Sequence, residues 1–170
     1  MNAIHHPGQE GQPLGGAINV EVEVEDRIET FAVTPTGETM LVDIIRAKFE
    51  NGSELHFFER DRDEPFKHHA EGRKHIRLVG HRCHEVKLKV RYEHETKDHD
   101  FKPSATVFRA LQWAVGKHGY NLDPMQAAKA NLILPGADQP LPREDVLGKL
   151  VKPGDCALVV DLTLKDFTNG

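Results

Sequence analysis

Apolar and polar residues alternate near the start of the chain and then change to a helical spacing. The alternation predicts a half-buried strand whose inner face carries Ile18, Val20, Val22 and Val24. The later spacing predicts an amphipathic helix with apolar positions at Leu41, Ile44, Ile45 and Phe49. Thr39 can cap the start of this helix and Gly52 its end. Strands are predicted around the helix at residues 18–25, 27–33, 54–60 and 74–80.

The second half of the chain repeats this order of elements. It opens on an alternating strand with apolar Val86, Leu88, Val90 and Tyr92. A helix follows within residues 104–119, with Ser104 or Thr106 as its cap and Gly119 after it. The remaining elements are a hairpin return at 94–103, strands at 131–134 and 155–162, and a short irregular helical turn at 142–150. The repeat lies in the order of elements and hardly in the residues.

Each half therefore predicts a hairpin, a helix and two further strands. Such a set packs best as a mixed sheet crossed on one face by the helix, which is an α+β fold. Each unit has roughly 70 residues, near the lower size at which a domain folds alone. The predicted organisation is a disordered arm, a first domain, a linker, a second domain and a tail, at residues 1–16, 17–80, 81–84, 85–163 and 164–170.

Composition narrows the possible classes of function. The 170 residues carry a formal net charge of -5 with acids and bases intermixed, so no basic surface indicates nucleic acid or an anionic membrane as a partner. No apolar run approaches the ~20 residues that span a bilayer, and the start does not look like a secretory signal. Cys83 and Cys156 make no disulfide framework, and Cys156 is interpreted as a small buried residue of the last strand. We therefore expect a cytoplasmic protein.

The sequence offers little that indicates catalysis or metal binding. His81, Cys83 and His84 lie too close together to turn toward one ion, and no Cys-x-x-Cys pair completes a tetrahedral site. The acidic residues in 61–64 could hold a cation but are more typical of a solvated turn. There is no Gly-rich phosphate loop, and neither cysteine has the histidine-and-acid context of a nucleophile. We predict a protein that is not an enzyme and needs no cofactor or metal.

Three segments of the second half resemble ubiquitin and its β-grasp relatives. The stretch PSATVFRALQWAV at 103–115 is similar to the family's turn into its helix. The stretch NLILPGADQPL at 131–141 is similar to its third strand and following turn, and PREDVLGKLVKPGDCALVVDL at 142–162 to its loop, short helix and final strand. The first half resembles the fold more loosely, through its hairpin and helix. The resemblance implies two tandem β-grasp (ubiquitin-like) domains.

Two such domains joined by a short linker resemble the two-lobed interferon-stimulated modifier of vertebrates. They also resemble the BilA-type proteins of bacterial antiphage conjugation operons. The resemblance implies a protein modifier whose C-terminal glycine is adenylated by an activating enzyme and carried as a thioester. A conjugating enzyme would then attach it to a target amine through an isopeptide bond, and a deconjugating peptidase would remove it. Phage structural proteins are candidate targets.

The resemblance also places a conjugation site at Gly170. The residues that enzymes would recognise as an extended tail are Asp166, Phe167, Thr168 and Asn169. A terminal glycine suits this role because it has no Cβ to hinder attack at its carboxylate. The sequence ends Asn169-Gly170, whereas most of the family has Gly-Gly. The alternative is an ordinary frayed terminus.

A second candidate site is a patch on the sheet of the second domain. The residues expected to point into the core are Leu132, Leu134, Leu158, Val160 and Leu162. Alternation then sends to the opposite face Ile133, Ala157 and Val159. Ubiquitin's recognition patch lies on this face, and clustered exposed apolar residues are candidates for partner binding. Alternatively, they pack against the first domain or the tail.

Three hypotheses of function follow. The leading one is a modifier conjugated through Gly170 by partner enzymes. The second is a non-covalent adaptor that binds partners through its sheet faces and tolerates loss of the last residues. The third is a sulfur carrier with a thiocarboxylate at Gly170, although the extra domain argues against it. Neighbouring genes for activating, conjugating and peptidase enzymes would favour the modifier, and genes of cofactor synthesis the carrier.

Overall fold

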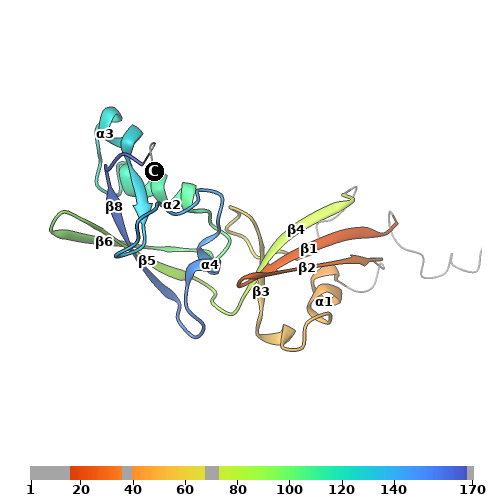
Figure 1. Cartoon of the computed structure of the whole chain (residues 1–170). Coiled ribbons are helices and arrows are strands. Elements are labelled where there is room, and N and C mark those ends of the chain that lie inside the picture. Colours follow the sequence, from red (N-terminus) through yellow and green to blue (C-terminus); the bar gives the residue numbers. More distant parts are fainter. Residues whose placement is uncertain (1–15, 36–39, 68–72, 168–170) are drawn as a thin grey trace, which may run out of the picture. The chain divides into compact units, whose positions relative to one another are not determined.

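The chain consists of two compact units. A computed structural model of the protein describes residues 16–35, 40–67 and 73–167 (Figure 1). One unit, the first lobe, comprises Met1–Glu59 and Glu64–Arg82. The other, the second lobe, comprises Arg60–Asp63 and Cys83–Gly170. Most of the arm predicted at residues 1–16 lies outside the described residues.

The first lobe is built on a four-stranded mixed sheet with strand order β2-β1-β4-β3. Strand β1 pairs antiparallel with β2 and parallel with β4, and β3 pairs antiparallel with β4. The strands are β1 (Ile18–Val24), β2 (Arg27–Val33), β3 (His56–Glu59) and β4 (His75–His81), and the helices are α1 (Leu41–Arg46) and the 3-10 turn η1 (Gly52–Glu54). The predicted alternation in β1 is confirmed, because its four apolar residues are all buried against α1.

Helix α1 is shorter than the sequence pattern predicts. It ends at Arg46, and its N-cap is Met40, which makes no capping hydrogen bond through its side chain. Thr39, the predicted cap, lies outside the described residues. The Arg46 guanidinium donates to the carbonyls of Gly52 and Leu55, at 3.0 and 3.2 Å, so the chain folds back over the helix end. Gly52 therefore belongs to the returning turn, and its predicted role as the end of α1 is wrong.

Gly52 is instead required by close packing. A Cβ atom at this position would overlap the backbone carbonyl of Arg46 and lie 2.8 Å from the Arg46 Cγ atom. We expect Gly52→Ala to lower the free energy of unfolding of the first lobe by roughly 1–3 kcal/mol, since the backbone must shift. Amide hydrogen exchange in β1 and β4 measures this loss. Ser53→Ala, a substitution at the exposed neighbouring residue, is the control. It should change the free energy of unfolding by no more than about 0.5 kcal/mol. Equal exchange in both variants would contradict the packing argument.

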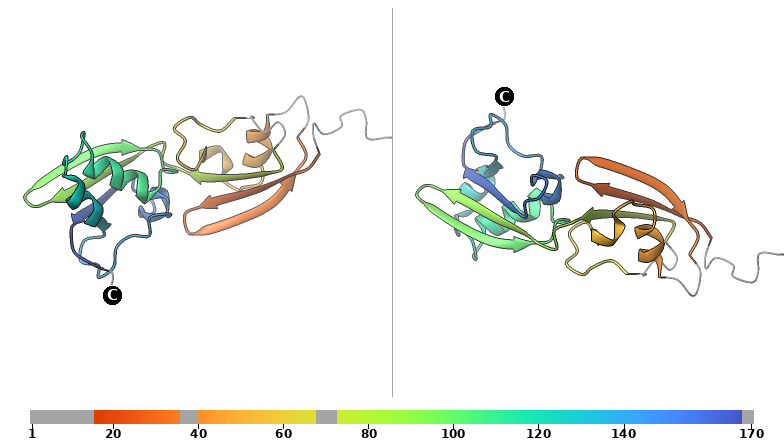
Figure 2. Two further views of the ribbon diagram at one scale, coloured as in Figure 1. Left: turned by 90° about the horizontal axis from the view of Figure 1, so that it is seen from above. Right: turned by 90° about the horizontal axis from the view of Figure 1, so that it is seen from below.

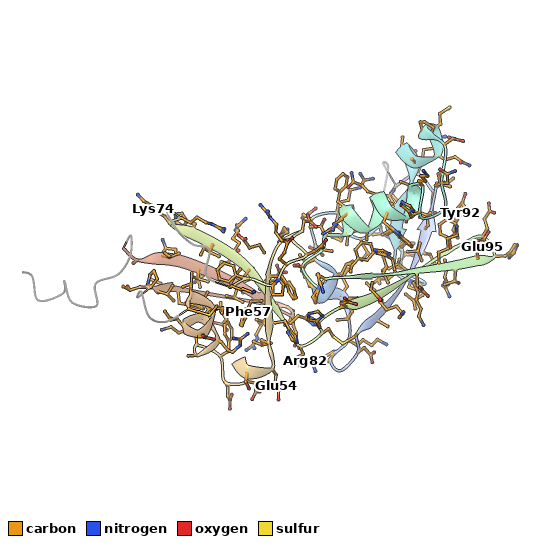
Figure 3. All side chains as sticks on the ribbon, turned by 180° about the vertical axis from the view of Figure 1, so that it is seen from behind. Glu54, Phe57, Lys74, Arg82, Tyr92 and Glu95 are labelled. Atoms are coloured by element: carbon orange, nitrogen blue, oxygen red, sulfur yellow. A yellow bond between two sulfur atoms is a disulfide. The ribbon has the colours of Figure 1, made fainter. Side chains whose placement is uncertain are left out.

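The second lobe repeats the same topology with strand order β6-β5-β8-β7. Strand β5 pairs antiparallel with β6 and parallel with β8, and β7 pairs antiparallel with β8. Tyr92 and Glu95 are paired residues at the turn of the β5–β6 hairpin (Figure 3). The elements are β5 (Val86–Tyr92), β6 (Glu95–Phe101), α2 (Val107–Val115), α3 (Pro124–Lys129), β7 (Asn131–Ile133), α4 (Leu147–Leu150) and β8 (Ala157–Thr163). Both lobes are thus β-grasp-like, and the predicted α+β class with tandem domains is confirmed.

Helix α2 lies against one face of its sheet (Figure 2) and supplies much of the core of the second lobe. Of the two predicted caps, Ser104 and Thr106, the N-cap is Thr106, since its hydroxyl accepts a hydrogen bond from the Arg109 amide at 3.2 Å. The helix ends at Val115, earlier than the prediction that it continues up to Gly119. Its buried residues are Val107, Ala110, Leu111 and Ala114. The chain then turns tightly, because the amide of Tyr120 donates to the Ala114 carbonyl at 2.7 Å.

Helix α3 is absent from the sequence-based predictions. None of its residues is buried, so it carries no apolar stripe that a periodicity search could detect. Its signal is a capping box instead: Asp123 accepts from the Gln126 amide at 2.8 Å, and the Gln126 side chain accepts from the Asp123 amide at 3.3 Å. Pro124 in the first turn completes the pattern. The spacing Asp-Pro-x-Gln could have revealed this helix.

The two cysteines form a disulfide, which corrects the expectation from the sequence. Cys83 and Cys156 are bonded across 73 residues of sequence with their Cα atoms 5.7 Å apart. Cys156 precedes β8 and is exposed, so it is not the buried strand residue that was predicted. The reason is the parallel pairing of β5 with β8, which aligns Lys87 with Ala157. The segments that lead into the two strands therefore lie side by side.

Candidate functional site

The tail of the second lobe leaves the sheet after Thr163. Residues 164–167 form neither helix nor strand. Leu164 still packs against the core, and the amide of Lys165 donates to the Thr163 hydroxyl at 3.0 Å. Beyond it, Asp166 is exposed and Phe167 is half-buried, with the Lys165 ammonium 5.5 Å from the centre of the Phe167 ring. The other predicted tail residues, Thr168, Asn169 and Gly170, lie outside the described residues.

A groove of about 610 Å³ lies beside this tail. Its walls include the end of α3 at Lys129, the loop residue Arg143, and the tail from Leu164 to Phe167. Arg143 is held in place, because its guanidinium donates to the carbonyl of Ala130 at 3.3 Å and to the Asn131 side chain at 3.4 Å. The groove therefore combines apolar surface with basic side chains at the root of the tail.

The predicted patch residues lie on the outer face of the second sheet. Ala157 is exposed, Val159 is 38% exposed and Ile133 is half-buried. The register places Ala157 beside Lys87 on β5, Val159 beside Lys89, and Ile133 opposite Asp161. Of the residues expected on the inner face, all are buried except Leu134, which is partly buried: Leu132, Leu158, Val160 and Leu162.

Ion pairs across the strands frame this outer face. The Arg91 guanidinium binds the Asp161 carboxylate through two hydrogen bonds, of 2.6 and 3.0 Å. The carboxylate hydrogen bond raises the pKa of Arg91 above its ordinary value. Lys87 pairs with Asp100 on β6 at 3.6 Å. The patch is therefore a small apolar surface between paired charges, which can supply weak and specific contacts to a protein partner.

The acidic segment predicted as a solvated turn makes defined contacts inside the second lobe. Asp61, with φ of 59°, accepts hydrogen bonds at its carboxylate from the Thr106 amide at 2.8 Å and from the Thr106 hydroxyl at 3.1 Å. The Arg109 guanidinium donates to the Asp61 carbonyl at 3.2 Å and to the Asp63 carboxylate at 3.0 Å. The segment thus holds the first turn of α2. In the described part of the chain, no group of three or more His, Cys, Asp or Glu residues could bind a metal.

The hydrogen bond from Arg109 lowers the pKa of Asp63 below its ordinary value of 3.8. Because the folded pKa is the lower one, the pair stabilises the second lobe fully above 3.8 and loses its effect as pH falls through the folded value. The Asp63 side chain is 60% exposed, so solvent screening keeps the effect small. The measurement is the urea concentration at half-unfolding of the second lobe, followed as the pH is lowered. In Asp63→Asn this midpoint should fall less steeply at acidic pH than in wild type, whereas the control Glu64→Gln should match wild type. An identical acid limb in wild type and Asp63→Asn would contradict this assignment.

The second lobe also has a counterpart among known proteins. Residues 87–165 match the family model described as BilA ubiquitin-like domain 2. The match runs from β5 to the start of the tail, so it contains Ile133, Ala157, Val159 and the groove-lining Lys129 and Arg143. No curated protein matches the chain. The BilA-type resemblance is thus supported for this ubiquitin-like domain, and the likeness to the interferon-stimulated modifier stays a prediction.

The described residues contain no helix that is both long and apolar enough to cross a membrane. Sequence reasoning located the patch because strand alternation is local. It missed the disulfide, the contacts of residues 61–63 with α2, and the groove at the root of the tail. Each of these three features depends on segments that are distant in sequence. Helix α3 was also missed, although its capping box is a local signal in the sequence.

Proposed function

We propose that this protein is a ubiquitin-like modifier that is conjugated to target proteins through Gly170 in bacterial antiphage defence. The observation that carries the proposal is the match of residues 87–165 to a BilA ubiquitin-like domain. The segment after β8 supports it, since residues 164–167 follow the last strand without entering helix or sheet. Attachment at Gly170 leaves the folded lobe intact while its end enters an enzyme.

The chemistry belongs to partner enzymes and not to this chain. The Gly170 carboxylate attacks the α-phosphate of ATP on an activating enzyme, which releases pyrophosphate and leaves an acyl adenylate. A cysteine thiolate of the same enzyme then displaces AMP and forms a thioester, and a cysteine thiolate of a conjugating enzyme displaces that thiolate in turn to form a second thioester. Finally, a target amine displaces the thiolate of a conjugating enzyme and forms an amide or isopeptide bond. A peptidase reverses this last bond by hydrolysis. These reactions place the protein in the cytoplasm, where ATP is available.

Recognition by these enzymes is assigned to two surfaces of the second lobe. Asp166, Phe167, Thr168 and Asn169 form the tail that an enzyme channel would hold, and the basic groove beside Lys129 and Arg143 lies at its root. The outer patch of Ile133, Ala157 and Val159 is the second surface. Ala157 and Val159 are exposed beside cross-strand ion pairs, as in surfaces that bind partners transiently.

Mass spectrometry of conjugates tests the proposal. The protein is expressed with its neighbouring genes, conjugates are digested with trypsin, which cuts after Lys165, and lysines are searched for a branch of residues 166–170. We expect the branch in wild type and its loss when Gly170 is deleted. Ser53→Ala, an exposed substitution in the first lobe that leaves the tail unchanged, serves as the control. If active neighbours and an intact tail yield no branch, conjugation through Gly170 is excluded.

A non-covalent adaptor is the second candidate function, and the accessible patch around Val159 favours it. Under this alternative, deleting residues 168–170 leaves partner capture unchanged, whereas Val159→Asp abolishes it. Under the conjugation hypothesis, the deletion abolishes covalent products even when capture persists. The two variants together separate the candidates.

A further inference from the structure

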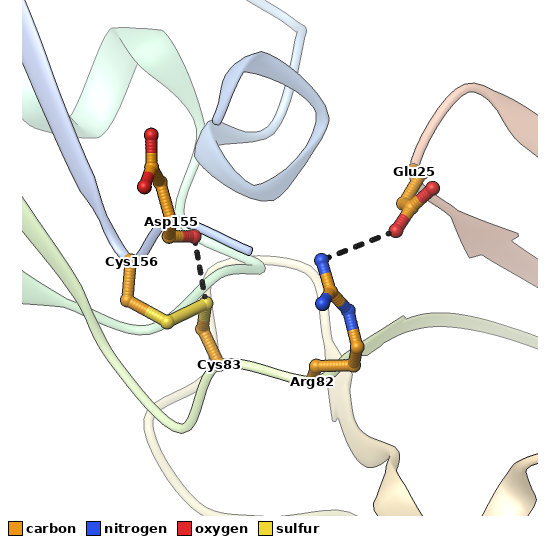
Figure 4. The surroundings of a disulfide bond; sticks show 5 residues. All are labelled: Glu25, Arg82, Cys83, Asp155 and Cys156. Carbon is orange, nitrogen blue, oxygen red and sulfur yellow. Dashed lines mark hydrogen bonds and ion pairs between the residues drawn. A yellow bond between two sulfur atoms is a disulfide. The ribbon is translucent and has the colours of Figure 1, made fainter. Parts of the chain in front are cut away.

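The two cysteines of the disulfide differ sharply in exposure. Cys83 is 4% exposed and belongs to the core of the second lobe. Cys156 is exposed, in the turn that precedes β8 (Figure 4). An incoming thiolate must reach one sulfur along the line of the S–S bond, so access decides which sulfur is attacked. Cys156 is therefore the entry point for exchange, and Cys83 the leaving group.

The surroundings of the bond are suited to both redox states. The Lys87 amide donates to the Cys156 carbonyl at 2.8 Å, so the sheet holds Cys156 near Cys83 independently of the sulfur atoms. Cys83 Sγ lies 3.1 Å from the Asp155 carbonyl oxygen (Figure 4). A disulfide sulfur has no proton to donate, whereas a Cys83 thiol could donate to this carbonyl. A reduced Cys83 thus finds an acceptor already in place.

We propose that Cys83 and Cys156 form a reversible thiol–disulfide exchange site that a thiol enters at Cys156. The lobe stays folded in both states, because β5 and β8 remain paired and Cys83 remains within the core. Cys156 is then the site of a mixed disulfide, and Cys83 is the resolving thiol that expels the adduct. This assignment is independent of conjugation at Gly170.

Reduction of the disulfide takes two successive thiolate displacements. A thiolate bonds to Cys156 Sγ, the bond between Cys156 and Cys83 breaks, and Cys83 leaves as a thiolate that takes a proton from water. A second thiolate attacks the adduct sulfur, which releases a small-molecule disulfide and a Cys156 thiolate that is also protonated. Two thiols are oxidised to one disulfide, and the protein gains two electrons and two protons. The reverse reaction needs a disulfide such as oxidised glutathione.

Wild-type protein in glutathione buffers provides the first test. Samples at graded ratios of reduced to oxidised glutathione are quenched with acid, alkylated and measured by mass spectrometry. We expect a reversible change between the disulfide and the dithiol, with native Trp113 fluorescence at both ends. A disulfide that persists in excess reduced glutathione under native conditions would overturn the proposal, as would thiols that never pair in oxidised buffer.

Single-cysteine variants identify the sulfur that is attacked. Cys83→Ser removes the resolving thiol, so oxidised glutathione should leave a stable adduct on Cys156. Cys156→Ser is the matched control. Its buried Cys83 should form the glutathione adduct at least roughly tenfold more slowly than Cys156 does in Cys83→Ser. Equal adduct formation in both variants, each with native Trp113 fluorescence, would overturn entry at Cys156. The result is read without activating enzymes, so it stands or fails separately from the conjugation experiment.

Discussion

Loss of the disulfide is expected to lower the free energy of unfolding of the second lobe by about 4 kcal/mol. The bond joins residues 73 positions apart, so it closes a loop that contains every described helix and strand of the second lobe except β8. In the chain-entropy model, a loop of this length restricts the unfolded chain strongly, while the folded lobe keeps its sheet and core. The measurement is urea unfolding followed by fluorescence of Trp113, the single tryptophan of the chain, which lies in α2.

The double variant that carries both Cys83→Ser and Cys156→Ser lacks the disulfide, as does reduced wild type. The two proteins should therefore unfold at the same urea concentration. The variant is also expected to become insensitive to added reductant. A midpoint equal to that of oxidised wild type would mean that the disulfide does not restrain the unfolded state of this lobe. A reduced wild type that is far less stable than the double variant would instead point to a cost of the two thiols themselves.

Leu88→Ala is expected to lower the free energy of unfolding of the second lobe by about 3 kcal/mol. Leu88 lies on β5 with 0% exposure, where truncation removes buried apolar surface and leaves a cavity. Val159 lies on β8, next to the partner of Leu88, and points to the outer face. Val159→Ala should therefore cost less than about 1 kcal/mol, since its side chain is already partly in water. Both values come from urea unfolding at constant redox state.

The comparison of Leu88 with Val159 tests the assignment of the two sheet faces. A large loss for Val159→Ala would show that the outer face is covered in the folded protein, as the packing alternative predicts. A small loss of unfolding free energy in Val159→Ala would show that Val159 can be changed without unfolding the lobe. Variants at this position can then be used to test partner binding. Comparable losses at both positions would contradict the alternation itself.

Local patterns in the sequence predicted the repeated elements of the fold. Alternation in Ile18–Val24 and Val86–Tyr92 marks strands with one buried face, and both are observed. Thr106, one of the two caps that the sequence allowed, caps α2. The outer position of Val159 follows from its neighbours Leu158 and Val160, which are buried. These features can be predicted from the sequence because the residues of a strand or a helix that face the core recur with a fixed period.

The lengths of the helices were predicted less well. The apolar spacing continues to Phe49, but α1 ends at Arg46 because the Arg46 side chain binds the returning chain. Phe49 contributes instead to a ring cluster, with its ring 6.1 Å from that of Phe31 and 6.0 Å from that of Phe57. Apolar spacing shows that residues face the core, but it does not show where the backbone leaves the helix.

The sequence by itself determined which residues form strands, which faces are apolar and that two similar units follow one another. Only the tertiary structure decided that Cys83 bonds to Cys156, that Asp61 binds Thr106, and that a basic groove lies at the root of the tail. These contacts join segments far apart in sequence, and their geometry depends on the register of β5 with β8 and on the path of the loops. The pairing of two strands depends on both segments, so the pattern of residues in one strand does not predict its partner or its register.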